Sequence, residues 1–375
     1  MAKQNKPAIR FKGFTDAWEQ RKVREITDRY DNLRIPVAAS LRIAGTTPYY
    51  GANGIQDYVE GYTHDGEFIL VAEDGANDLK NYPVKCVKGR IWVNNHAHVL
   101  QGKCACADNQ FLAYAISQAD IESLLVGGGR AKLNAETLMD IELLLPSKDE
   151  QRQIGSYLAR LDNLIALHQR KYDKLQVLKK AMLEKMFPKN GSSVPEIRFK
   201  GFTDAWEQRK AKDLCSISTG KSNTQDRVDD GIYPFYVRSP IVEHSNRYLF
   251  DEEAVLTVGD GVGTGKVFHY VNGKYDLHQR VYRMFDFSEE ITAKYFYYYF
   301  SNHFYDRVMA MTAKTSVDSV RYEMIADMDI ALPKVKEQMA ISAYFDRLDH
   351  LITLHQRKLE KLQNIKKSML EKMFV

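Results

Sequence analysis

The sequence predicts an α+β fold class: two α+β domains separated by an antiparallel two-helix coiled-coil spacer, arranged as a pseudo-twofold tandem repeat. Three observations predict it. The string IRFKGFTDAWEQRK occurs at residues 9–22 and again at residues 197–210. Residues 161–187 and 348–374 also match closely and have the apolar spacing of long amphipathic helices. The blocks between these matched flanks share no comparable identity, so a duplicated scaffold carries two unlike inserts.

Length and composition limit the class of protein. A chain of 375 residues exceeds one typical domain of about 150 residues. With 44% hydrophobic and 27% charged residues, it has the composition of a soluble globular protein. No apolar run reaches the roughly 18–20 residues that span a bilayer, so we expect no membrane partner. The start MAKQNKPAIRFKGF lacks the apolar stretch of a signal peptide, and we expect a cytoplasmic protein.

Cysteine content and charge narrow the possibilities further. Four cysteines are too few for a disulfide framework, and we expect free thiols. The net charge of +4 permits a polyanionic partner but does not demand one.

The repeat divides the chain into five predicted segments. A Pro, Gly and Ser-rich stretch after the first helical segment reads as a linker. We place the first α+β domain at residues 1–148, the first spacer helix at 149–187, the linker at 188–196, the second α+β domain at 197–335 and the C-terminal spacer helix at 336–375.

Both variable blocks have the pattern of short strands and tight turns. In the first block the runs are TTPYYGANGIQDYVEGY, GEFILVAEDGAN and GRIWVNNHAHVL. In the second they are YPFYVRSPIVEHS, EAVLTVGDGVGTGKVFHY and KYDLHQRVYRMFDF. Alternating apolar and aromatic residues between Gly, Asn and Asp are typical of strands joined by turns. Helical signals follow before a Leu-Pro exit, which makes each block an α+β domain.

The two long segments have the spacing of coiled-coil helices. About 37 residues at about 1.5 Å each give a rod of roughly 55 Å, which is too long to bury its apolar stripe against one small domain. We therefore expect the two helices to pair, antiparallel. The predicted seam comprises Leu161, Ile165, His168, Leu175, Leu348, Ile352, His355 and Leu362. We interpret its two histidines as hydrogen-bonded residues that fix register. The basic face of each helix is either solvated or contacts a partner protein or DNA phosphates.

The turns of both blocks are rich in groups that bind base edges or phosphates. Asn and Gln pair with adenine, Arg and Lys pair with guanine, and hydroxyl groups and lysines bind phosphates. The first block's DNA-binding candidates are Tyr49, Tyr50, Asn53, Asn94, Asn95, His96, Arg130 and Lys132. The second block's candidates are Arg238, Lys266, His269, His278, Gln279, Arg280, Lys314, Thr315, Ser316 and Arg321.

Segments that resemble catalytic or metal-binding motifs do not have the residue spacing that those motifs require. The segment GDGVGTGK lacks the first Gly and the final Ser or Thr of a phosphate-binding loop, so we expect a turn between strands. His96, His98, Cys104 and Cys106 do not follow a standard zinc spacing, and we predict no metal site. The sequence contains no Asn-Pro-Pro-aromatic tetrapeptide, dinucleotide fingerprint or G-x-S-x-G elbow. We therefore predict that the chain has no catalytic residues and no cofactor of its own.

Taken together, these motifs resemble the DNA-specificity (S) subunit of type I restriction-modification systems. The resemblance rests on FKGFTDAWEQRK, on the Leu-Pro exit with its following Glu-Gln, and on the helix that ends in LEKMF. The block signatures PYYGANGIQDY, LVAEDGAN, WVNNHAHVL, YPFYVRS and VGDGVGTGKV strengthen it. It covers essentially the whole chain.

The resemblance implies a function and a set of partners. Each block would be a target-recognition domain for one half of a bipartite site in double-stranded DNA, and the helices would fix the gap between the halves. The subunit would be noncatalytic and would bind two modification (methyltransferase) subunits and two restriction (motor and nuclease) subunits. S-adenosylmethionine, ATP and Mg would be held by those partners.

Two other readings compete with this one. A structural coiled-coil adaptor without DNA specificity would not need two elaborate and divergent blocks. A self-contained DNA-modifying enzyme would need a cofactor-binding motif. Because the two recognition blocks differ, we expect an asymmetric site, whereas identical blocks would imply a palindrome. A rod of roughly 55 Å exceeds the roughly 34 Å of one duplex turn, so the blocks would reach successive major-groove faces.

Overall fold

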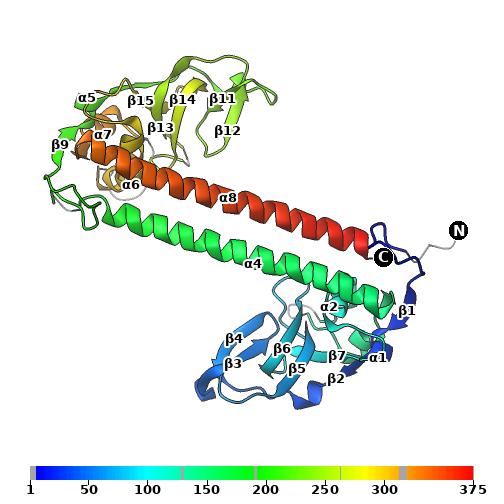
Figure 1. Ribbon diagram of the computed structural model, residues 1–375. Helices are drawn as coiled ribbons and strands as arrows, with labels where there is room; N and C mark the ends of the chain where they lie inside the picture. Colours follow the sequence, from blue (N-terminus) through cyan, green and yellow to red (C-terminus); the bar gives the residue numbers. More distant parts are fainter. Residues whose placement is uncertain (1–5, 128–130, 190–191, 262, 312–318, 375) are drawn as a thin grey trace. The chain divides into compact units, whose positions relative to one another are not determined.

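The computed structural model describes residues 6–127, 131–189, 192–261, 263–311 and 319–374 of the chain. These residues form two compact units (Figure 1). The first unit comprises Met1–Gln169 and Arg357–Val375, and the second comprises Arg170–Gln356. The C-terminal segment therefore completes the first unit.

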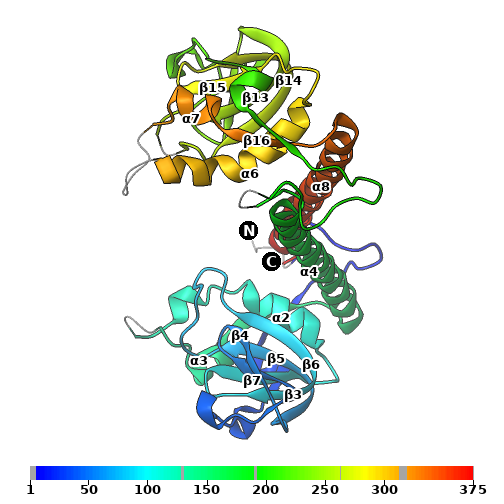
Figure 2. The same cartoon turned by 90° about the vertical axis from the view of Figure 1, so that its left-hand side faces the viewer.

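A six-stranded sheet lies at the centre of the first unit. The strand order is β2-β7-β5-β6-β3-β4, and neighbours are antiparallel except for the parallel pair β3 and β6. The strands are β2 (Thr27–Arg29), β3 (Ala44–Gly51), β4 (Gly54–Val59), β5 (His64–Ala72), β6 (Val84–Val93) and β7 (Ala97–Gly102). Helix α2 (Asn109–Ser117) begins where the Asp108 side chain accepts a hydrogen bond from the Phe111 amide, and it covers one face of the sheet (Figure 2).

Short elements complete this unit. Strands β1 (Glu19–Lys22) and β8 (Glu142–Leu145) pair antiparallel, which joins the start of the domain to its exit. The others are α1 (Val23–Ile26), α3 (Ala135–Asp140) and the 3-10 turns η1 (Asp31–Leu33), η2 (Ala39–Leu41) and η3 (Glu122–Leu124).

The second unit repeats this topology with different residues. Its sheet has the order β10-β15-β13-β14-β11-β12, again with one parallel pair, β11 and β14. The strands are β10 (Ser216–Thr219), β11 (Tyr233–Tyr236), β12 (Val242–Ser245), β13 (Phe250–Val258), β14 (Phe268–Leu277) and β15 (Val281–Phe285), with β9 (Glu207–Lys210) paired to β16 (Asp329–Leu332). The helices are α5 (Ala211–Leu214), η4 (Thr224–Asp226), α6 (Ala293–Met311) and α7 (Tyr322–Ala326). The predicted α+β class is confirmed.

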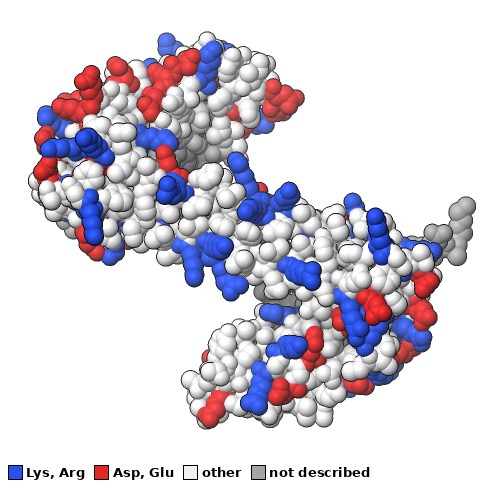
Figure 3. Space-filling model, viewed as in Figure 1, with Lys and Arg blue, Asp and Glu red and all other residues white. Residues whose placement is uncertain are grey.

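Two long helices, α4 (Lys148–Lys185) and α8 (Val335–Met373), form the predicted antiparallel pair (Figure 1). In the first unit the Lys366 ammonium lies 2.6 Å from the Asp162 carboxylate. In the second unit Lys179 forms the matching ion pair with Asp349. Lys and Arg side chains stand on the exposed faces of both helices (Figure 3). Among the described residues, no helix is both long and apolar enough to cross a membrane.

The predicted seam residues differ in burial. Leu161, Leu348 and Ile352 are buried. Leu175 and Leu362 pack partly buried against the cores of the second and first unit, respectively. Ile165, His168 and His355 are half-buried. The assignment of the two histidines to helix register stays a prediction.

A repeated tyrosine attaches each domain to both long helices. The Tyr114 hydroxyl of α2 donates to Asp162 of α4 at 2.6 Å, and Lys366 of α8 lies 5.5 Å from the Tyr114 ring. In the second unit the Tyr298 hydroxyl of α6 lies 3.0 Å from Asp349, and Lys179 lies over its ring. Each domain is therefore anchored by the same three side-chain types, which limits its rotation on the helix pair.

The repeated motif acts as an internal anchor. Arg10 binds the buried carboxylate of Glu150 through two hydrogen bonds of 2.6 and 2.7 Å, and Arg198 binds Glu337 through two of 2.7 Å. The following glutamine, Gln151 or Gln338, bonds to the exit loop at Pro146 or Pro333. The Arg of IRFKGF and the Glu-Gln after Leu-Pro are thus paired across each unit.

Candidate nucleic-acid interface

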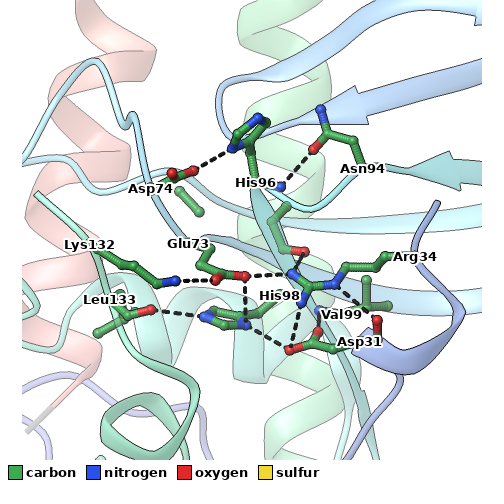
Figure 4. Close-up of polar contacts among 12 residues, drawn as sticks. Asp31, Arg34, Glu73, Asp74, Asn94, His96, His98, Val99, Lys132 and Leu133 are labelled. Carbon is green, nitrogen blue, oxygen red and sulfur yellow. Dashed lines mark hydrogen bonds and ion pairs between the residues drawn. The ribbon is translucent and has the colours of Figure 1, made fainter. Parts of the chain in front are cut away.

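Four segments of the first unit meet in a loop cluster, which we define as residues 31–34, 73–77, 94–98 and 132–133. The Glu73 amide donates to the His96 carbonyl at 2.9 Å, and the Leu133 amide donates to the Glu73 carbonyl at 2.7 Å. Asn53, in the β3–β4 turn, joins the cluster through bonds to the Gly75 carbonyl and the Asn77 amide. Figure 4 shows the side chains of this cluster pointing toward one another.

A partly buried ionic network lies within the cluster. Arg34 bonds to Glu73 at 2.6 Å and to the Ala97 carbonyl at 2.9 Å. His98 is buried and places Nδ1 2.8 Å from Asp31 and Nε2 2.9 Å from the Leu133 carbonyl. Both ring nitrogens of His98 therefore face oxygen acceptors.

The two carboxylates of this network are held ionised. Burial by itself would raise the pKa of Asp31, but hydrogen bonds from His98 and the Val99 amide lower it. Burial also opposes ionisation of Glu73, yet bonds from Lys132 and Arg34 lower its pKa. Carboxylates with lowered pKa values stabilise the fold above the pKa of the unfolded chain, and the contribution is lost as pH falls through the folded pKa.

This network gives a stability prediction. Asp31→Asn should lower the free energy of unfolding by about 1–3 kcal/mol at pH 7, because it removes a charged acceptor from His98. The loss should shrink as pH falls below about 4, the ordinary pKa of an aspartate, and through the lower pKa of the folded Asp31 carboxylate. Chemical denaturation at a series of pH values measures both effects. Asp28→Asn, at an exposed position of β2, serves as control. An equal effect of the two substitutions would contradict the prediction.

The second unit has a matching loop cluster, defined as residues 222–226, 238, 259–260, 278–280 and 319–320. The Gly259 amide donates to the Arg280 carbonyl at 2.8 Å, and the Val320 amide donates to the Gly259 carbonyl at 2.6 Å. The isolated bridge Asp260–Ser319 has the place that Asp74–Lys132 has in the first unit. The backbone scaffold is thus the same in both clusters.

The three-residue turns 94–96 and 278–280 close in the same way. The Asn94 and His278 amides donate to the carbonyls of Tyr50 and Tyr236, each at 3.0 Å. The Asn94 Oδ1 then accepts from the His96 amide at 2.8 Å, and the His278 Nδ1 accepts from the Arg280 amide at 3.0 Å. Burial lowers the pKa of His278, which favours the neutral ring that can accept this bond.

The side chains that project from the two turns differ. His96 Nδ1 lies 2.5 Å from Asp74 in the first unit. In the second unit Asp260 lies 3.7 Å from Arg280 and 3.5 Å from Arg238. The middle residue of the second turn, Gln279, bonds to Asn223 at 2.5 Å. The middle residue of the first turn, Asn95, is exposed. An equivalent acidic residue therefore holds a histidine in one unit and two arginines in the other.

The predicted candidates of the first block fall into two groups. Asn53, Asn94, Asn95, His96 and Lys132 lie in or next to the loop cluster. Tyr49 and Tyr50 are buried, and the Tyr49 ring stacks on Trp92 while its hydroxyl meets the Val37 backbone. Burial means that these tyrosines can act on DNA only through the loops they support. Arg130 lies outside the described residues.

The candidates of the second block are more scattered. Arg238, His278, Gln279 and Arg280 lie in the cluster, and Arg321 follows it directly and is exposed. Lys266 lies over the Tyr305 ring at 4.8 Å, and His269 packs on Tyr236. The described residues of GDGVGTGK, 259–261 and 263–266, lie between β13 and β14, which confirms the predicted turn between strands. Lys314, Thr315 and Ser316 lie outside the described residues.

Several residues of both clusters were not among the sequence candidates. They are Asp31, Arg34, Glu73, Asp74, His98, Asn223 and Asp260. An Asp-Gly pair after a strand occurs in both LVAEDGAN and VGDGVGTGKV, and this shared signal could have identified Asp74 and Asp260. Within the described residues, no group of three His, Cys, Asp or Glu side chains is placed to hold a metal ion.

Comparison with known proteins gives a consistent family description. The family model described as "Type I restriction modification DNA specificity domain" matches residues 15–177 and again residues 203–364. A Haemophilus influenzae protein named as a type I restriction enzyme specificity subunit is 45% identical over 143 residues, or 38% of this chain and 36% of that protein. This match therefore spans little more than a third of that relative's length.

Two further comparisons extend over most of the chain. A type I restriction enzyme specificity subunit of Methanocaldococcus jannaschii is 25% identical over 299 residues, covering 72% of this chain and 70% of that protein. The crystal structure of a type I restriction-modification S subunit from M. genitalium matches with a TM-score of 0.79 at 14% identity, over 99% of both chains. At this identity the structural likeness concerns the fold.

Proposed function

The chain belongs to the family of type I restriction modification DNA specificity domains, and we propose that it is the sequence-specific DNA-recognition subunit of a type I restriction-modification complex. Its site is asymmetric and bipartite, with one half read by each unit. The loop clusters around residues 94–96 and 278–280 approach the bases, and the pair of long helices fixes the gap between the halves.

One observation carries this proposal: two units share a backbone scaffold and differ in the side chains of the matched turns. The first turn offers Asn95 and His96, and the second offers Gln279 and Arg280. Asn95 and Gln279 both suit an adenine edge, whereas the third residues differ: Arg280 has the forked donors that suit guanine O6 and N7, and His96 does not. Two copies of one scaffold with unlike contact residues are what a site with two unlike halves requires.

The long helices suit the role of a spacer. Each has 38 or 39 residues, which corresponds to roughly 57 Å of helix. The ion pairs Asp162–Lys366 and Lys179–Asp349 resist sliding of one helix along the other. A spacer that cannot slide sets the unread gap without contacting bases.

The duplicated anchors favour two copies of each partner. Exposed residues of the repeated motif, such as Glu19 and Arg21, recur unchanged as Glu207 and Arg209. A modification subunit that recognises this surface would bind once to each unit, and two restriction subunits would join the assembly. The partners hold S-adenosylmethionine, ATP and Mg, and this chain contributes recognition and no catalytic residue.

Mapping methylated adenines tests the proposal. DNA from cells that carry this chain with its modification subunits should be methylated at a single motif made of two unlike half-sites and a fixed gap. Cells with the modification subunits alone should lack it. Methylation that follows no bipartite motif, or a palindromic motif from the unaltered chain, would contradict the proposal.

A further inference from the structure

The first residue of each matched turn has a structural role. Asn94 and His278 are both 4% exposed, and each directs a side-chain acceptor to the amide two residues later. A group that is buried and already bonded to its own turn cannot reach a base edge. The second and third residues of the turn remain: Asn95 and Gln279 are exposed, and His96 and Arg280 lie beside an acidic side chain.

The charges of the second cluster favour a base contact over a phosphate contact. Arg238 and Arg280 lie on either side of Asp260, at 3.5 and 3.7 Å. The carboxylate repels phosphate oxygens but leaves a net positive charge for a neutral, electron-rich base edge. At these distances it orients the guanidinium groups without binding either in a tight bidentate pair. Arg280 remains 64% exposed, so its donors are accessible.

Resting on the proposed function, we propose that the second and third turn residues are the base-discriminating positions of both units. Arg280 reads a guanine through its O6 and N7 acceptors in one half-site, and Asn95 reads an adenine through N6 and N7 in the other. Asp260 and Asp74 are positioning residues, which set the direction of Arg280 and His96.

The decisive variant is Arg280→Gln. The full chain, assembled with its modification subunits, selects sequences from a randomised pool of duplex DNA, and the bound fraction is sequenced. Wild type should require guanine at one base pair of one half-site. The variant should lose that preference by roughly tenfold or more, while the other half-site keeps its profile. Arg227→Gln, at an exposed arginine that pairs with Asp229 and Glu243, should leave every position unchanged.

The first unit provides the reciprocal test. Asn95→Ala should relax an adenine requirement in the opposite half-site by a similar factor. Asn163→Ala, an exposed asparagine of α4 in the same unit, is the matched control. Relaxation in the same half-site for both Arg280→Gln and Asn95→Ala would overturn the inference.

The role of Asp260 must be tested by a measurement that does not depend on fold stability. Asp260→Asn should weaken discrimination at the base pair affected by Arg280→Gln and at no other. In the double variant the two losses should not add, because both act through one guanidinium group. Additive losses would assign Asp260 to a separate role and overturn its positioning function.

The outcomes separate this inference from the proposed function. If Arg280→Gln weakens binding equally for all sequences and reduces its salt dependence, Arg280 contacts a phosphate and the inference fails, although the chain still recognises a bipartite site. If the wild-type assembly selects no motif from the pool, the proposed function fails as well.

Discussion

Glu150→Ala should lower the free energy of unfolding of the first unit by about 3–5 kcal/mol. Glu150 is fully buried and receives two hydrogen bonds from Arg10, whose side chain is 14% exposed. Removal of the carboxylate leaves a nearly buried guanidinium without its acceptor. The substitution also detaches the repeated motif from the start of α4, so the loss reaches the packing of Trp18 and Phe111.

Chemical denaturation followed by tryptophan fluorescence measures this effect. The neighbouring Asp149→Ala removes an 81% exposed carboxylate and should cost no more than about 1 kcal/mol. Glu337→Ala should give the same large loss in the second unit, which contains one tryptophan, Trp206, as the reporter. A loss below about 1 kcal/mol for either glutamate variant would show that these ion pairs do not anchor the repeated motif.

Insertion of four residues after position 169 of α4 and after position 356 of α8 should widen the unread gap of the DNA site. Four residues add about 6 Å and slightly more than one helical turn, against about 3.4 Å for each base pair. We therefore expect one or two additional base pairs between unchanged half-sites. Both insertions fall at the unit boundaries, so the ion pairs Asp162–Lys366 and Lys179–Asp349 stay intact.

Methylation mapping gives the half-sites and the gap in one measurement. Four residues inserted after Val194 add length outside both helices and should leave the gap as it is. An insertion in α4 alone should disturb helix pairing and lower stability. If the paired insertions changed the bases read and left the gap unaltered, the spacer role of the helices would be refuted.

The repeated scaffold could be predicted from the sequence because its features are local or identical. Apolar residues at helical spacing predicted both long helices, and two copies of one motif predicted the duplication. The pairing of the two long helices followed from their length, since a helix of this length cannot bury its apolar stripe against one small domain. Arg10 and Glu150 are 140 residues apart in the sequence, and no local pattern predicts that they pair.

The sequence identified candidate recognition residues, but it could not separate the exposed candidates from the buried ones or align the two turns. The flanks repeat after 187 or 188 residues, whereas the turns repeat after 184 and the acidic residues after 186. A constant offset therefore misaligns Asn94 with His278 and Asp74 with Asp260. Burial is also a tertiary property. Tyr49, in an exposed-looking turn sequence, is 1% exposed because it packs under Arg42 and against Trp92.

The two ends of each variable block lie side by side on the scaffold, which makes a direct exchange possible. The Val23 amide donates to the Ile141 carbonyl at 3.0 Å, and the Ala211 amide donates to the Met328 carbonyl at 2.9 Å. The two ends of each block therefore meet at the same place on the scaffold. Tyr114 would meet Asp349 and Lys179 in the second unit as it meets Asp162 and Lys366 in the first.

The most direct measurement replaces residues 211–328 with residues 23–141 and maps the methylated motif of the resulting chain. That chain carries two copies of the first recognition block on an unchanged spacer. We predict an inverted repeat of the first half-site, with the gap of the original motif. Retention of the original asymmetric motif, or loss of the first half-site from the motif, would contradict recognition of one half-site by each unit.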